Sequence, residues 1–164
     1  MRQLPKARPV GIALATLLLL LVGGSCATAP TPTQRPPSVF VIPTDLPNGR
    51  AEITIAPSYP IGATLTIPIA IVATRGTITG PVTARIMASG INEGGKPAEV
   101  LVRDLVVTPV IVAGGRRSTT VTWDTRDQNG VLVPADAYSL VLELRSDDAG
   151  TTKTVRAGAT LELR

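Results

Sequence analysis

Residues 119–145 read TTVTWDTRDQNGVLVPADAYSLVLELR, and this stretch decides the fold. Val121 and Trp123 lie two positions apart between threonines, and a long alternation of aliphatic and mixed residues begins at Tyr138. Because a strand has a period of two, each alternation places its apolar side chains on one face. The stretch predicts two strands, with the Trp123 and Tyr138 rings in the core and the tyrosine hydroxyl bonded to nearby backbone.

Two turns are predicted between these strands. Asn129-Gly130 stands beside an apolar run, and Asn-Gly is the strongest short signal for a primed hairpin turn. Such a turn needs positive φ at both of its central residues. We therefore expect a hairpin whose second strand includes residues 131–133, followed by a second turn that begins at Pro134.

The spacing of this stretch, W-D-x-R-D-x-x-G-x-x-V-P-x-x-x-Y, resembles a signature of bacterial Ig-like domains. It is similar to the Ig-like domain of flagellar hook-capping proteins and to the BsuPI-type proteinase-inhibitor domain. The residues of the signature in this chain are Trp123, Asp124, Arg126, Asp127, Gly130, Val133, Pro134 and Tyr138. The resemblance implies an Ig-like antiparallel β-sandwich, and it marks a scaffold turn rather than an active site. Two glycines of the pattern are replaced, by Thr125 and Asp136.

The composition and pattern of residues 50–164 also favour an all-β fold. Aromatic residues make up 2% of the chain, glycine and proline number 15 each, and no helical period of useful length occurs. Seven to nine short strands over about 115 residues are typical of a β-sandwich. Pro68 lies inside an alternating run, which predicts an edge or bulged strand, and Pro109 should divide residues 100–112 into two pieces. A final strand is expected after residue 151, with an interruption near Gly158.

The first 25 residues have the three parts of an export signal. Basic residues precede an apolar run over residues 10–22, and small residues stand directly before Cys26. This end of the leader resembles the lipobox of bacterial lipoproteins, although Gly23 stands where leucine is usual. The resemblance implies a lipid on the Cys26 thiol and cleavage that leaves Cys26 as the N-terminus. The alternatives are a cleaved leader without lipid and an uncleaved anchor over residues 9–30.

The sequence divides into a signal segment (residues 1–25), a Pro- and Thr-rich linker (26–49) and a β-sandwich domain (50–164). Proline at the density of the linker favours extended polyproline-II chain. Residues 38–42 interrupt the linker with a short β-like run, which is a candidate first edge strand. We expect Phe40 to pack there rather than to recognise a ligand.

The net charge of +4 gives no argument for nucleic-acid binding. Three of the 16 basic residues and none of the 12 acidic residues lie in the leader, so its removal leaves a net charge of +1. The largest basic cluster is Arg116-Arg117, expected at a solvated hairpin tip, and the aromatic residues needed for base stacking are scarce. No nucleic-acid partner is therefore expected.

The sequence predicts no catalytic residue, no metal site and no cofactor. With no His and one Cys, the chain cannot build Ser-His or Cys-His nucleophiles or zinc sites of the Cys and His type. Most aspartates stand in predicted turns, where a carboxylate ordinarily caps the backbone. Residues 127–130 match part of a calcium loop, but the EF-hand pattern fails at Thr125 and at Asp136.

These observations predict an exported lipoprotein, anchored on the extracytoplasmic face of the membrane, that displays a non-catalytic Ig-like domain for protein binding or structural support. Its expected partners are the membrane, through Cys26, and an unidentified protein. A BsuPI-like proteinase inhibitor is one alternative, and it needs a rigid exposed loop, for which residues 90–97 and 114–117 are candidates. A scaffold subunit of an envelope or flagellar-type assembly is another, and it predicts an exposed apolar patch or an unpaired sheet edge.

Overall fold

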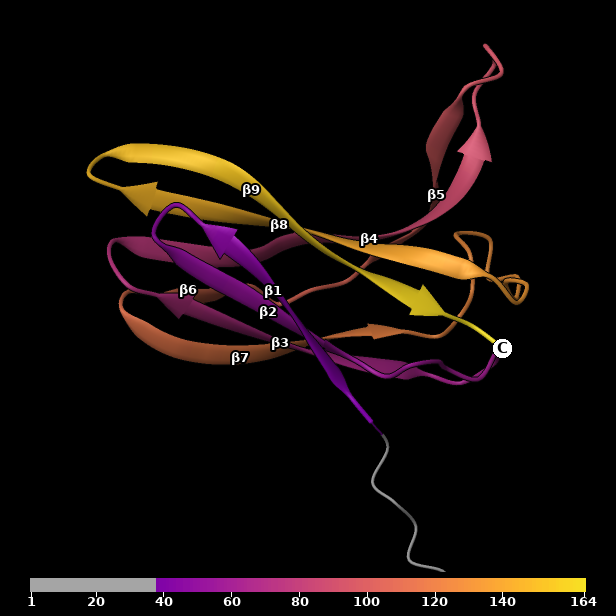
Figure 1. Cartoon of the computed structure of the whole chain (residues 1–164), viewed down its shortest axis with the longest axis horizontal. Coiled ribbons are helices and arrows are strands. Elements are labelled where there is room, and N and C mark those ends of the chain that lie inside the picture. Colours follow the sequence, from indigo (N-terminus) through magenta and orange to yellow (C-terminus); the bar gives the residue numbers. More distant parts are fainter. Residues whose placement is uncertain (1–37) are drawn as a thin grey trace, which may run out of the picture. The chain divides into compact units, whose positions relative to one another are not determined.

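The computed structural model describes residues 38–164, which form nine strands in two antiparallel sheets (Figure 1). The first sheet has the order β1-β2-β3-β7, made of Phe40–Leu46, Gly49–Ile55, Leu65–Ala73 and Gly115–Trp123. The second has the order β5-β4-β8-β9, made of Pro97–Leu105, Thr77–Ile91, Ala137–Asp148 and Thr151–Glu162. The short strand β6, Val110–Val112, pairs with the first part of β4. The predictions for the signal segment, Cys26 and most of the linker concern residues outside this range.

Both sheets contribute to one hydrophobic core. Ile53, Ile67 and Ile69 of the first sheet and Leu140 and Leu142 of the second are 0% exposed. Burial of such a side chain stabilises a fold by about 1.5–3 kcal/mol. The predicted alternation after Tyr138 is confirmed, because every second residue of β8 is buried.

The first sheet begins inside the range assigned to the linker. β1 pairs with β2 over its whole length, from Phe40 opposite Ile55 to Leu46 opposite Gly49. The candidate edge strand is therefore formed and is longer than predicted. The expectation that Phe40 packs is wrong, since its side chain is 54% exposed. Ile42 and Leu46 are the β1 side chains that pack in the core on this face, and Phe40 lies beyond Ile42.

The predictions for Pro68 and Pro109 have different outcomes. The break near Pro109 is confirmed, since β5 ends at Leu105 and β6 starts at Val110. The prediction that Pro68 lies in an edge or bulged strand is right only in part, because β3 as a whole lies between β2 and β7 and pairs with β7 without a register shift. The pairing of β2 with β3 stops at Ile69, so Pro68 stands where β3 is paired with β7 alone. The missing amide proton of the proline is tolerated there.

The ends of β4 and β5 form a projecting two-stranded arm, residues 89–100. β8 pairs with β4 as far as Ala88, whereas β5 continues along β4 to Ile91 (Figure 1). β4 is one strand of 15 residues, whose register against β8 shifts between Thr79 and Thr83. Residues 90–97, a candidate exposed loop in the sequence, are thus the end of the β4–β5 hairpin.

β9 runs without the predicted interruption at Gly158. A Cβ on this residue would lie 3.0 Å from the Leu140 carbonyl oxygen, so glycine allows a close approach of the strands. Within residues 38–164 there is no helix that is long and apolar enough to cross a membrane.

Candidate functional site

The signature residues gather around the two buried rings. Trp123 ends β7, Tyr138 lies at the start of β8, and the two are 1% and 3% exposed, which confirms the expectation that they are core residues. Their rings meet edge to face with centroids 5.4 Å apart. The indole nitrogen of Trp123 donates to the Arg126 carbonyl at 2.9 Å, and the Tyr138 hydroxyl donates to the Pro134 carbonyl at 3.0 Å. Each ring therefore holds the loop that joins β7 to β8.

Asp127 organises the tip of this loop. Its Oδ1 accepts hydrogen bonds from the amides of Asn129, at 2.9 Å, and Val131, at 2.8 Å. The predicted primed turn is wrong, because Gly130 has φ 78° while Asn129 is not in the left-handed region. The carboxylate cap favours a turn with one left-handed residue. The strand predicted over residues 131–133 is reduced to a single bridge between Arg126 and Leu132.

Thr125, which stands where the signature has glycine, has a left-handed backbone. It is 0% exposed and has φ 56°, which is unusual for a β-branched residue. Its hydroxyl donates to the Asp124 carbonyl at 2.7 Å and accepts from the Gly62 amide at 2.9 Å. These bonds offset a backbone strain of about 1–3 kcal/mol. Asp136 shows no such backbone, and its carboxylate caps the Ala137 amide at 2.7 Å.

The remaining polar residues of the signature also bond to the loop itself. The Asp124 carboxylate accepts from the Arg126 amide at 3.2 Å, and the Arg126 guanidinium donates to the Gly130 carbonyl at 2.7 Å. The Gln128 amide donates to the Val102 carbonyl at 2.9 Å, so the loop also covers the outer edge of β5. The polar groups of the signature therefore stabilise the conformation of their own loop.

Perturbed carboxyl groups lie in surface ion pairs rather than in a cleft. The hydrogen bond from Thr83 lowers the pKa of Glu143, with Arg156 and Arg85 beside it. The hydrogen bond from Arg116 lowers the pKa of Glu52 in the same way, at 2.6 Å. Arg116 is thus an ion-pair partner, not part of a free hairpin tip. Groups held ionised in this way are poorly suited to act as general acids.

The Tyr138 hydroxyl is held in its protonated form. Burial raises its pKa, and the nearby Asp136 carboxylate adds to the shift. Residues 38–164 contain no group of three or more acidic, His or Cys side chains that could hold a metal ion. The described part of the chain therefore has a packed tyrosine and capped turns around the signature.

Two hollows lie at opposite ends of the strands. The first, of about 400 Å³, lies beside the signature loop, with apolar walls from Ala88, Leu101, Val133 and Tyr138. Its walls come from residues about 50 positions apart, so no local pattern in the sequence predicts this hollow.

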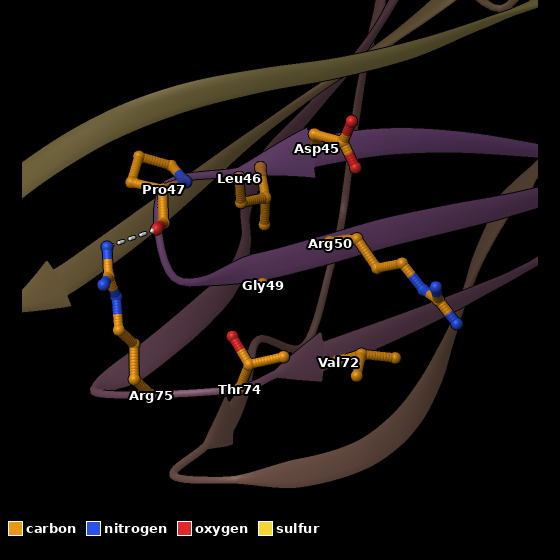
Figure 2. Close-up of a pocket in the computed structure, with 8 residues that line it drawn as sticks. All are labelled: Asp45, Leu46, Pro47, Gly49, Arg50, Val72, Thr74 and Arg75. Carbon is orange, nitrogen blue, oxygen red and sulfur yellow. Dashed lines mark hydrogen bonds between the residues drawn. The ribbon is translucent and has the colours of Figure 1, made fainter.

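The second hollow, of about 550 Å³, lies between the β1–β2 hairpin and the end of β3 (Figure 2). Both arginines that line it are already engaged. Arg75 pairs with Asp148 at 3.0 Å and donates to the Pro47 carbonyl at 3.1 Å, and Arg50 pairs with Glu52 at 2.8 Å. Each guanidinium that lines this hollow is thus already paired with a carboxylate.

Exposed apolar side chains mark the edges of the sheets instead. Val39, Phe40 and Val41 are 58%, 54% and 55% exposed at the start of the edge strand β1. Ile91 is 74% exposed on the arm, near the turn that ends it. These are the surfaces that a contact with another molecule would bury.

No protein-family model matches the chain, and no curated protein matches it either. The resemblance to bacterial Ig-like domains thus depends on the spacing between Trp123 and Tyr138 and on the strand pattern.

Proposed function

We propose that this chain is a cell-envelope lipoprotein, anchored through Cys26, that displays a non-catalytic Ig-like β-sandwich for protein binding or structural support. Two antiparallel sheets with a common core support the sandwich architecture. A tyrosine hydroxyl bonded to backbone a few residues upstream, as Tyr138 is to Pro134, recurs at the corners of Ig-like sandwiches and supports the same proposal.

A single observation supports a binding or structural role over a catalytic one. The polar groups of the signature bond to the backbone of their own loop, whereas Phe40 and Ile91 expose apolar surface at a sheet edge and on the arm. Exposed apolar residues beside unpaired strand edges are suited to contacts with other molecules.

The anchor is tested by metabolic labelling with a fatty-acid probe. Wild-type protein should take up the label, and Cys26→Ser should not, because the thiol is the proposed attachment point. A matched Ser25→Ala variant, which keeps a small residue before the cysteine, should label like the wild type. Equal labelling of wild type and Cys26→Ser would rule out the lipid anchor.

A proteinase inhibitor is the second candidate, since the tip of the arm is held in one conformation. The Asn92 side-chain oxygen accepts from the amides of Gly94 and Lys96, both at 3.0 Å, and the Asn92 amide donates to the Lys96 carbonyl at 2.9 Å. A rigid loop loses less entropy on binding. A panel of proteases tests this role: inhibition by wild type that is lost when residues 92–96 are replaced by a plain two-residue turn would favour it.

A subunit of an envelope assembly remains the other structural role. The free edge of β1 supports it. Pull-down from envelope extracts should then bring a defined assembly with the wild-type chain and not with a Phe40→Ser variant.

A further inference from the structure

The hollow beside the signature loop carries negative charge that no cation of the described chain neutralises. Asp127 and Asp136 line it, together with Gln128, Asn129 and the apolar walls. Neither aspartate forms an ion pair within residues 38–164, and the lining residues include no Arg or Lys. The hollow of Figure 2 differs, since each of its two arginines is paired with a carboxylate.

Both carboxylates keep one oxygen available for a ligand. Asp127 Oδ1 accepts from two amides of its own turn, and Asp136 Oδ1 accepts from the Ala137 amide. The Oδ2 atom of each aspartate forms no hydrogen bond with the described part of the chain. Burial is the main cause of the raised pKa of Tyr138, and the Asp136 carboxylate adds to it, so this charge acts on the wall of the hollow.

Two arginines bond to the signature loop, and both use backbone carbonyls. The Arg126 guanidinium donates to the Gly130 carbonyl at 2.7 Å, and Arg103 donates to the Asp127 carbonyl. Arg103 also lines a different hollow, together with Trp123. Neither arginine is among the residues that line the charged hollow, so a cation that fills it comes from another molecule.

Both elements that form the hollow also expose apolar side chains. Leu101 belongs to its wall and is 43% exposed, and the neighbouring Val100 on the arm is 50% exposed. Val131 and Leu132 are exposed on the signature loop, which lies at the same end of the domain as the arm (Figure 1). A charged pocket beside exposed apolar surface is typical of a protein interface, in which a central residue is buried and apolar contacts exclude water around it.

We propose that this hollow is a docking site for an arginine side chain of a partner protein, with the aliphatic stem against the apolar walls and the guanidinium paired with Asp127 and Asp136. The inference names the chemistry of the partner in the proposed binding role and rests on that role. A guanidinium forms directed hydrogen bonds with carboxylates, and its stem packs on apolar surface. The volume of about 400 Å³ lies within the range of pockets that hold a small ligand, so one side chain fits.

The test uses the full-length protein in detergent on an array of immobilised pentapeptides. Each peptide has arginine at its centre and valine, leucine, threonine or serine at the flanking positions. Each is matched by a copy in which citrulline replaces the arginine, because citrulline keeps the shape of the side chain and has no charge. The ratio of protein retained on the two copies measures the contribution of the charge.

Asp136→Asn is the main variant, because an asparagine oxygen can still cap the Ala137 amide while the charge is lost. Asp45→Asn is the matched control, since Asp45 is an exposed aspartate that lines the hollow of Figure 2. Ala88→Leu adds bulk to the wall of the charged hollow at unchanged charge. Urea unfolding, followed by the fluorescence of Trp123, checks that each variant is folded.

The arginine peptides that bind should retain wild type about tenfold more strongly than their citrulline copies, as expected for a charge-assisted contact. Asp136→Asn and Ala88→Leu should each remove most of this difference, and Asp45→Asn should leave it unchanged. Equal retention on arginine and citrulline peptides would overturn the inference. Equal losses for Asp136→Asn and Asp45→Asn, or an unchanged difference in folded Ala88→Leu, would also overturn it, because the attraction would then lie outside the hollow.

The pull-down from envelope extracts separates this inference from the proposed binding role. If no arginine peptide retains the wild type but the pull-down still brings a defined assembly, the domain binds through another surface and only the arginine site is wrong. If neither experiment shows binding, the binding role fails and the arginine site falls with it.

Discussion

The stability of the domain should depend strongly on Asn48, a buried polar residue in the β1–β2 turn next to the hollow of Figure 2. Its side-chain nitrogen donates to the carbonyls of Thr77, at 3.1 Å, and Asp147, at 3.3 Å. Its side-chain oxygen accepts from the Ser146 hydroxyl at 2.7 Å. One amide thus joins a turn of the first sheet to β4 and β8 of the second.

Asn48→Ala removes all three bonds, whose partners are one buried hydroxyl and two partly buried carbonyls. At about 1 kcal/mol of net stabilisation for each hydrogen bond, the expected loss in free energy of unfolding is about 3 kcal/mol. Ser146→Ala removes one of the three bonds and should cost about 1 kcal/mol. Because the two residues share that bond, the double variant should lose less than the sum of the single losses.

Urea unfolding of the full-length protein in detergent measures these values. The fluorescence of Trp123 reports the transition, since it is the one tryptophan of the chain and is buried. Asn129→Ala is the matched control, because this exposed asparagine uses only its backbone amide in the turn, and its loss should stay within about 0.5 kcal/mol. If Asn48→Ala were no more destabilising than Asn129→Ala, the bridging role would be refuted.

Three further predictions concern the signature loop and the surface. Thr125→Ala keeps the left-handed backbone and loses the hydroxyl, so urea unfolding should show a loss of about 1–2 kcal/mol in the free energy of unfolding. Thr125→Gly also relieves the backbone strain, so its loss should be smaller. A larger loss for Thr125→Gly than for Thr125→Ala would contradict the strain assigned to φ 56°. Tyr138→Phe loses one hydrogen bond and keeps the ring, so a loss of about 0.5–1.5 kcal/mol is expected, and no change would show that the bond to Pro134 is unimportant. The lowered pKa of Glu143 implies a stabilisation that is fully present above the pKa of this carboxyl in the unfolded chain and is lost as pH falls through its pKa in the folded protein. Glu143→Gln should therefore make the melting temperature fall less steeply as the pH is lowered. The same fall in wild type and variant would refute the role assigned to Glu143.

The parts of the fold that the sequence predicted are those fixed by local patterns. The alternation after Tyr138 and the break at Pro109 each depend on a few neighbouring residues, and both are confirmed. The strand order could not be predicted in the same way. Whether β3 has a partner on both sides at Pro68 depends on where its pairing with β2 ends. That pairing ends at Ile53 opposite Ile69, two residues that are 16 positions apart in the sequence.

Side-chain hydrogen bonds explain the other differences. Asn129-Gly130 has the sequence of a primed turn, but the Asp127 carboxylate accepts hydrogen bonds from the Asn129 and Val131 amides and favours a different turn. The bonds of the Asn48 side chain leave no local pattern in the sequence, because its partners include Ser146, 98 residues away. Such bonds can be found in a sequence only when the strands that they join are already known to be neighbours.

The roles of the signature loop and of the exposed apolar residues can be separated by experiment. Thr125 and Tyr138 are buried and bonded to backbone, so substitutions there should change stability and leave surface contacts alone once the protein is folded. Phe40 and Ile91 are exposed, so substitutions there should change contacts at little cost in stability. The buried ring residues of the signature are therefore the wrong place to search for a partner. Exposed apolar side chains are the better place, and they lie at the start of β1 (Val39, Phe40 and Val41), on the arm (Ile91) and at the tip of the signature loop (Val131).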